Sequence, residues 1–258
     1  MTVLLEELTR DQIKAIAPTA IAVLPTASIE QHGPHLPVVT DTLLCGAVAR
    51  RAAERAAGRA QVLVTPVLTF GNSHHHRPFA GVLSLASDTY MAAVRDVLEG
   101  LVLSGFKKLV VLNGHGGNTD SNAVVGLDFV NRLGHPVAIA TASYWDIARP
   151  AIVEKGLMAG ARIPGHAGRF ETAMVMAIRP DLVNREGLAQ ARPVEAAPGL
   201  FAALTGGTVQ IHGKWAASTG YTDEPAAATA EEGEAMLAIV VERVAEFLVA
   251  FDQTAQAG

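Results

Sequence analysis

Residues 28–41, SIEQHGPHLPVVTD, contain several side chains that can bind a metal ion or transfer a proton. They are Glu30, His32, His35 and Asp41, with Gln31 beside them. Alternate residues of an extended backbone point to the same side, so Glu30 and His32 are expected to face one space. A glycine and two prolines then turn the chain, and Asp41 follows where a helical pattern begins. Asp41 is therefore either the N-cap of that helix or another side chain facing the same space.

A second group, NGHGGN at residues 113–118, directly follows an apolar run and contains His115. Glycine-rich loops after strands can bind phosphate through backbone N–H groups. This loop lacks that chemistry, because Thr119 stands where a dinucleotide-binding motif needs a third glycine, and no phosphate-loop lysine is present. His115 is either a hydrogen-bonded structural residue or a ligand, and its place at the same sheet edge as Glu30 favours the ligand.

A third group, GHAGRFET at residues 165–172, contains His166 and Glu171. Taken alone, Glu171 could simply be a first-turn acid stabilised by the helix dipole, and His166 a surface loop residue. Five side chains from the three groups form a candidate ligand set of two histidines and three carboxylates: His32, His115, Glu30, Asp41 and Glu171. This set suits a divalent ion such as zinc, manganese or iron without any thiolate.

Apolar strands and helices alternate along the chain and must position these side chains. The pattern predicts strands at 19–25, 61–68, 107–114 and 136–145, and helices at 4–17, 42–57, 88–104, 119–133, 171–179 and 231–251. Asp88 is the expected N-cap of the third helix, and residues 146–230 are otherwise weakly patterned. Non-alternating apolar strands separated by helices predict an α/β fold with a mostly parallel sheet and helices on both faces. Ligands of such sheets bind beyond the carboxyl ends of the strands, where the first two groups lie.

Composition narrows the class of protein. The 258 residues, with no linker-like segment, are expected to form a single domain over 1–258. No apolar run is long enough to span a bilayer and the N-terminus shows no cleavage pattern, so a cytoplasmic protein without a membrane partner is expected. The net charge of −5 and the absence of a basic stripe argue against nucleic acid as a partner. The single cysteine, Cys45, excludes a disulfide framework and is expected to be buried.

Three motifs in this order resemble the creatininase (creatinine amidohydrolase) family: EQHGPHLP followed by TDT, then NGHGGN, then HAGxxET. GNSHHHRPFAGVLSL and GYTDEPAAATAEEGE are weaker matches, and the similarity extends over residues 19–240. The resemblance implies a three-layer αβα sandwich with a mostly parallel central sheet. It also implies a site for two divalent metal ions, zinc or manganese, and a cytoplasmic homohexamer.

The same resemblance assigns roles to the candidate residues. By it, Glu30, Asp41 and His115 bind one ion, and His32, Asp41 and Glu171 bind the other, so that Asp41 is shared. His166 matches the catalytic histidine of the family.

Other positions bear on the substrate. His76 falls where the family keeps a histidine, and Trp145 resembles one of two tryptophans that clamp the substrate. Two positions depart from the creatininase pattern: Gly117 replaces a metal-binding glutamate, and Arg162 stands where the second tryptophan would be. These departures disfavour creatinine itself. Arg162 and Arg169, with Arg77 as a rival, are candidates to bind an anionic group of the substrate through paired N–H donors.

The expected activity is metal-dependent hydrolysis of a C–N amide bond other than a peptide bond, in a small cyclic or formamide substrate. Metal ions would activate the attacking water, and His166 would donate a proton to the leaving nitrogen. Three alternatives remain open: hydrolysis of a peptide bond in a small peptide, hydrolysis of a C–C bond in a cyclic polyol diketone, and a non-catalytic metal-binding module.

Overall fold

The computed structural model describes residues 2–194, 209 and 211–257. Four parallel strands form one sheet in the order β2-β1-β3-β4. Their bounds are β1 Ile21–Thr26, β2 Val62–Val64, β3 Lys108–Asn113 and β4 Ala138–Ser143. The α-helices are α1 Arg10–Ile16, α2 Thr40–Ala56, α3 Ser87–Leu103, α4 Thr119–Asn131, α5 Tyr144–Glu154, α6 Arg169–Ile178, α7 Arg185–Gln190 and α9 Ala230–Ala257. Short 3₁₀ helices lie at Leu5–Glu7, His74–His76, Gly116–Asn118, Pro180–Leu182 and Pro225–Ala227.

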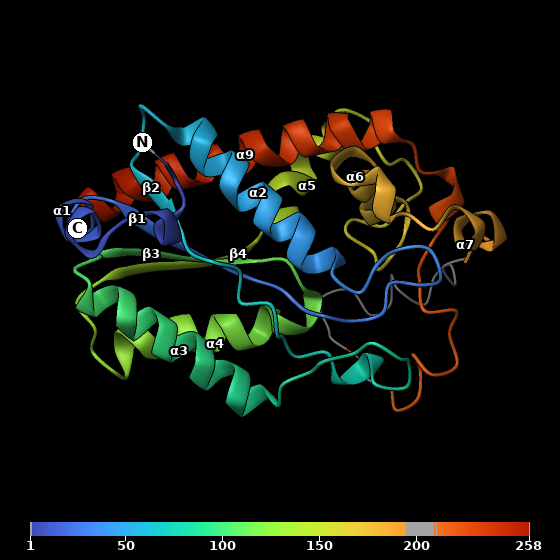
Figure 1. The fold of residues 1–258 in the computed structure, drawn as a ribbon, viewed down its shortest axis with the longest axis horizontal. Helices are drawn as coiled ribbons and strands as arrows, with labels where there is room; N and C mark the ends of the chain where they lie inside the picture. Colours follow the sequence, from blue (N-terminus) through green and yellow to red (C-terminus); the bar gives the residue numbers. More distant parts are fainter. Residues whose placement is uncertain (1, 195–208, 210, 258) are drawn as a thin grey trace.

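Helices cover both faces of this sheet, as the sequence predicted. Figure 1 shows α3 and α4 below the sheet, and α2, α5, α6 and α9 above it. Each face has its own hydrophobic core, because side chains alternate along a strand. In β1, Ile21 and Val23 pack with the α2 and α9 side, whereas Ala22 and Leu24 pack with the α3 and α4 side. The expected α/β sandwich is therefore confirmed.

The strand register brings the carboxyl ends of three strands to one edge. Thr26 at the end of β1 pairs with Asn113 at the end of β3, and Asn113 pairs with Ser143 at the end of β4. The loop that follows β3 also packs tightly on α2, since a Cβ built on Gly114 would lie 2.4 Å from the Cβ of Cys45. The loops that follow β1 and β3 therefore begin side by side at this edge of the sheet.

Several predicted boundaries are corrected. The helix expected at 4–17 is a 3₁₀ turn followed by α1, because Thr9 and Gln12 form a capping box that starts a new helix. Asp88 is not an N-cap: Ala86 occupies that position, and Asp88 instead accepts a hydrogen bond from the backbone N–H of Thr89.

The chain after β3 also differs from the prediction. The strand expected at 136–145 ends at Ser143, and helix α5 then runs to Glu154 with Pro150 inside it. Hydrophobic periodicity did not predict this helix, because the segment contains a proline and most of it belongs to the weakly patterned region.

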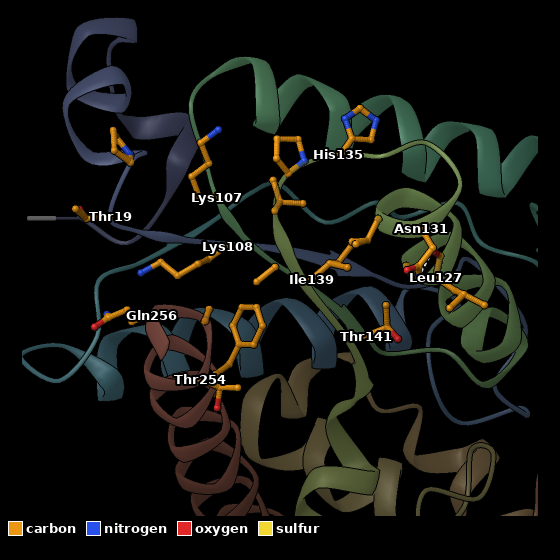
Figure 2. Close-up of a pocket in the computed structure, with 18 of the residues that line it drawn as sticks. Thr19, Lys107, Lys108, Leu127, Asn131, His135, Ile139, Thr141, Thr254 and Gln256 are labelled. Atoms are coloured by element: carbon orange, nitrogen blue, oxygen red, sulfur yellow. Dashed lines mark hydrogen bonds between the residues drawn. The ribbon is translucent and has the colours of Figure 1, made fainter. Parts of the chain in front are cut away.

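A large hollow of the described structure lies away from the strand ends just discussed. Figure 2 shows it beside β4, α4 and the end of α9, with a volume of about 1400 Å³. Its lining residues include Lys107, Leu127, His135 and Ile139. They include none of the predicted site residues. None of the described helices combines the length and the apolar character needed to span a membrane.

Candidate metal centre

The five predicted metal ligands come from four parts of the chain and lie together. Glu30 and His32 are in the loop after β1, Asp41 is in the first turn of α2, His115 follows β3, and Glu171 is in the first turn of α6. All five side chains are buried. The open choice for Asp41 is resolved by its position, because it faces the other four rather than capping α2, whose N-cap residue is Val39.

Asp41 lies between two histidines. Its Oδ1 atom is 3.1 Å from Nε2 of His32, and its Oδ2 atom is 3.1 Å from Nδ1 of His115. A carboxylate with one oxygen directed to each side has the form of a ligand shared by two ions.

On one side of Asp41, three potential metal ligands lie together. Ligand atoms of His32, Asp41 and Glu171 all lie within 4.8 Å of one another, and Oε2 of Glu171 is 3.8 Å from Nε2 of His32. The backbone N–H of Ala167 donates to Oε2 of Glu171 over 2.6 Å and so fixes this carboxylate. This group matches the second ligand set implied by the sequence.

On the other side, Glu30 and His115 approach each other, with Oε2 of Glu30 3.4 Å from Nε2 of His115. Ligand atoms of Glu30, His75 and His115 lie within 4.8 Å of one another. The sequence placed Glu30, Asp41 and His115 in this set and did not include His75. Oε1 of Glu30 faces two further histidines, 3.4 Å from Nε2 of His76 and 3.5 Å from Nδ1 of His166.

Unsatisfied buried oxygens test whether metal ions fit these residues. Both carboxylate oxygens of Glu30 and Oδ2 of Asp41 are buried and have no hydrogen-bond partner among the described residues. A buried carboxylate oxygen without a hydrogen bond costs free energy unless a positive charge lies close to it, which a protonated histidine or a metal ion can supply. Nitrogen and oxygen ligands are those that zinc or manganese accepts, so the site fits divalent ions.

Burial and close charges shift the pKa values of these groups. Burial raises the pKa of Glu30 to about 7 and that of Glu171 to about 8. Burial opposes a charge on His32 and His115, but the neighbouring carboxylates outweigh it and raise their pKa values to about 10 and about 9. Burial would also raise the pKa of Asp41, but His32 and His115 outweigh that effect and hold it well below its ordinary value.

His166 stands beside this cluster. Burial lowers its pKa well below the ordinary value for histidine, and the neighbouring histidines, His32 foremost, lower it further, so the imidazole is neutral. Its ring lies 4.5 Å from that of His32 and 4.2 Å from that of His76, measured between centroids. A neutral imidazole with one nitrogen directed to a carboxylate can accept and return a proton.

The predicted substrate residues divide into two pairs. His76 and Trp145 line a cavity of about 150 Å³ at the cluster, together with Glu30, Asp41, His75, Gly114, His115, Gly116, Gly117, Pro164, Gly165, His166, Glu171 and Trp215. Arg162 and Arg169 are not among these lining residues. Arg169 forms an ion pair with Glu232, and the backbone N–H groups of both arginines donate to Asp223.

Two other early candidates support the cluster from outside the cavity. His35 is buried, and its Nε2 atom is 3.0 Å from Oγ1 of Thr172 in α6, so it connects the loop after β1 to the helix that carries Glu171. Cys45 is buried as expected, and its thiol donates to the backbone carbonyl of Leu112.

The sequence did not identify Trp215. Its ring centroid lies 4.3 Å from that of His76 and 5.1 Å from that of His166, so it forms a wall of the cavity. Trp215 belongs to the weakly patterned region, where only its being one of two tryptophans could have drawn attention to it.

Gln31 was noted in the sequence without a role. Its Nε2 atom is 3.0 Å from Nδ1 of His76 and 2.9 Å from Nε2 of His166. Its Oε1 atom accepts a hydrogen bond from the backbone N–H of Gly33, which fixes the orientation of the amide. Gln31 therefore positions two of the histidines that line the cavity.

Several known proteins are similar to this chain in sequence and in fold. The Creatininase family model, described as creatinine amidohydrolase, matches residues 6–248. Creatinine amidohydrolase from Pseudomonas putida is 29% identical over 250 residues, which cover 91% of each chain. The mycofactocin precursor peptide peptidase of Mycobacterium ulcerans (strain Agy99) is 29% identical over 239 residues, covering 91% of this chain and 86% of its own. A crystal structure of creatinine amidohydrolase (creatininase) superposes with a TM-score of 0.81 and 29% identity, covering 98% of each chain. The chain therefore belongs to the creatininase family of hydrolases.

Proposed function

We propose that this protein is a metal-dependent amidohydrolase that cleaves a C–N bond of a small substrate with two divalent ions. The observation that carries the proposal is the position of Asp41, with one oxygen 3.1 Å from His32 and the other 3.1 Å from His115. Glu171 on one side and Glu30 on the other complete two ligand groups that share a carboxylate. A carboxylate shared in this way would hold two ions side by side.

Zinc and manganese are the ions we propose. The ligands are imidazole and carboxylate groups, which suit both metals. Similar solved structures include a creatininase variant of Zn-Zn type and a creatininase described with Mn.

The proposed mechanism assigns His166 the proton transfers. Bound divalent ions would lower the pKa of water and polarise a carbonyl oxygen. His166 is neutral because of its burial, and its Nδ1 atom faces the cavity beside Glu30. This nitrogen would accept a proton from the attacking water and give it to the leaving nitrogen, a role typically worth about 10²–10⁴ in rate.

The size of the cavity favours a small chemical group as the one that is cleaved. Its volume of about 150 Å³ is below the roughly 300–1,000 Å³ typical of drug-sized ligands. Trp215 and His76 would contact the planar face of an amide or formamide there, as aromatic rings do with flat groups.

A second candidate, cleavage of a peptide bond in a small peptide, is favoured by space next to the cavity. Hollows of about 410 and 610 Å³ adjoin it, and His75 and Trp215 line both of them as well as the cavity itself. A longer substrate could extend there from a bond held at Asp41. The peptidase similarity is consistent with this arrangement.

The larger hollow also supports a substrate with an anionic group. Arg77, His212 and Lys214 line it, and no carboxylate residue is among its lining residues in the described part of the chain. Arg77 thereby replaces Arg162 and Arg169 as our candidate for binding a carboxylate or phosphate.

We also propose a cytoplasmic protein that assembles as a homo-oligomer, a hexamer by family resemblance. Exposed apolar side chains support assembly, including Leu127 on α4 at 66% and Val153 on α5 at 62% exposure. The net charge of −5 supports the absence of a nucleic-acid partner.

The decisive experiment combines elemental analysis with a substrate panel. Purified protein should contain two divalent ions per chain, and should hydrolyse a member of a panel of creatinine, N-formyl compounds, cyclic amides, short peptides and a cyclic polyol diketone. Treatment with a chelator should abolish the activity, and zinc or manganese should restore it. Full activity of the metal-free protein would contradict the proposal, and bound ions without activity on any amide would favour a non-catalytic module.

A further inference from the structure

The three consecutive histidines of the loop after β2 make different contacts. Nδ1 of His74 is 2.9 Å from Oδ1 of Asn72 and 3.3 Å from the hydroxyl of Ser84, and Nδ1 of His76 is 3.0 Å from the amide nitrogen of Gln31. His75 makes ring contacts, but neither of its ring nitrogens has a hydrogen bond to any described residue. Of the three, His75 alone has both nitrogens available to a ligand from outside the chain.

His75 faces the metal cluster. Its ring is nearly parallel to that of His115, with an interplanar angle of 7° and centroids 5.8 Å apart. One of its nitrogens lies within 4.8 Å of ligand atoms of both Glu30 and His115. Glu30 is the residue beside it that lacks partners, since both of its carboxylate oxygens are buried without a hydrogen bond in the described structure.

The backbone beside this face leaves no room for a competing ligand. A Cβ built on Gly117 would lie 2.1 Å from the carbonyl oxygen of Asn72, 2.5 Å from Nε2 of His115 and 3.1 Å from Cε1 of His75. A side chain at residue 117 would have to displace these atoms, whereas residue 75 already has a side chain there.

We infer that His75 is a metal ligand of this protein and coordinates the ion held by Glu30 and His115. The inference rests on the proposed function, because it adds a residue to the same metal site. A neutral imidazole here leaves Glu30, Asp41 and Glu171 as the carboxylates of the cluster, so two divalent ions keep a net positive charge of one. More nitrogen in the ligand set also favours zinc over manganese at this position.

The test replaces His75 by alanine and uses His74→Ala as the matched control. Both histidines lie in the same 3₁₀ helix, and only His75 belongs to a ligand group. Two quantities are measured. The first is the metal content after dialysis, and the second is the affinity for each zinc ion, from calorimetric titration of the metal-free protein. We expect wild type and His74→Ala to bind two ions per chain. His75→Ala should bind one of them at least about 100-fold more weakly, because loss of even an outer-shell partner costs 10- to 100-fold.

Cobalt provides a readout at the ligand itself. Co²⁺ substituted for the ion held by Glu30 and His115 should give a visible absorption spectrum. This spectrum should change in His75→Ala and stay the same in His74→Ala. X-ray absorption of the zinc form should show one fewer imidazole per chain in His75→Ala.

The outcomes separate this inference from the proposed function. If His75→Ala binds two ions with wild-type affinities and an unchanged cobalt spectrum, His75 is not a ligand, although the metal-dependent hydrolase stands. If the wild-type protein itself binds no divalent ion, the proposed function fails first. Thermal unfolding of the metal-free variants should match wild type, which shows that both are folded.

Discussion

The Nε2 atom of His166 lies 2.9 Å from the backbone carbonyl oxygen of Gln31 and 2.9 Å from its side-chain nitrogen. A carbonyl oxygen only accepts hydrogen bonds, so it favours the tautomer in which Nε2 carries the proton. In that tautomer the amide of Gln31 donates to His76 instead. The lone pair of His166 is then on Nδ1, which is directed toward Glu30 and the cavity.

His166→Ala should therefore retain both ions and lose turnover. Loss of a general acid–base group typically lowers kcat by about 10²–10⁴. Elemental analysis and kcat measured on the same preparation check this prediction. A variant that keeps more than a tenth of the wild-type kcat would show that another group transfers the proton.

Substitutions at the ligands should separate the two ions. Asp41→Ala should weaken the binding of both, because Asp41 contacts ligands of both groups, whereas Glu171→Ala should affect only the ion shared with His32. Calorimetric titration with zinc measures the number of sites that remain. Equal loss in the two variants would contradict the sharing role of Asp41.

The metal-free protein should become less stable as the pH rises from about 6.5 to 9. Folding raises the pKa of His32 to about 10, of His115 to about 9, of Glu171 to about 8 and of Glu30 to about 7. Over this range the folded chain binds more protons than the unfolded chain, so the free energy of unfolding falls with pH.

Thermal unfolding at fixed pH steps in the presence of a chelator tests this expectation. Bound metal requires deprotonated ligands, so the metal-loaded protein should show a smaller loss, and its metal affinity should increase with pH. His32→Gln should also flatten the profile of the metal-free protein. A melting temperature of the metal-free wild type that rises with pH would contradict the prediction.

Gly117→Ala should destabilise the protein, whereas Gly116→Ala should not. The added methyl group at 117 would lie 2.1 Å from a backbone oxygen and 2.5 Å from His115, but the one at 116 has nothing within 4 Å. Overpacking of this kind costs about 1–3 kcal/mol. Denaturant unfolding of the two variants, side by side, measures the difference, and equal stabilities would show that the loop adjusts freely.

Trp215→Ala should raise KM more than it lowers kcat. The ring stands over His76 and His166 and also contacts the ring of His75, but it offers no metal-binding atom, so metal content should not change. Lost stacking on a planar substrate is worth about 0.5–1.5 kcal/mol, which corresponds to a roughly 2- to 13-fold rise in KM. Trp215→Phe should restore most of the affinity. An unchanged KM in both variants would remove Trp215 from the substrate pocket.

The sequence alone predicted the parallel sheet, helices that cover both its faces and the five buried candidate metal ligands. These follow from local signals: apolar runs such as that of β3 specify buried strands, and parallel strands place their carboxyl ends at one edge. Glu30, His115 and Glu171 each stand next to such a strand or at the start of an apolar helix, so residue type and position sufficed. The length of α5 and the cap of α3 were missed because proline and competing caps change local structure without altering the hydrophobic pattern.

Only the tertiary structure decided which side chains meet across long separations in sequence. Arg169 lies two residues before Glu171, yet it pairs with Glu232 of α9. Trp215 and His75, which are far apart in the sequence, both line the cavity. The direction of a loop side chain depends on packing between elements, and no local periodicity encodes it.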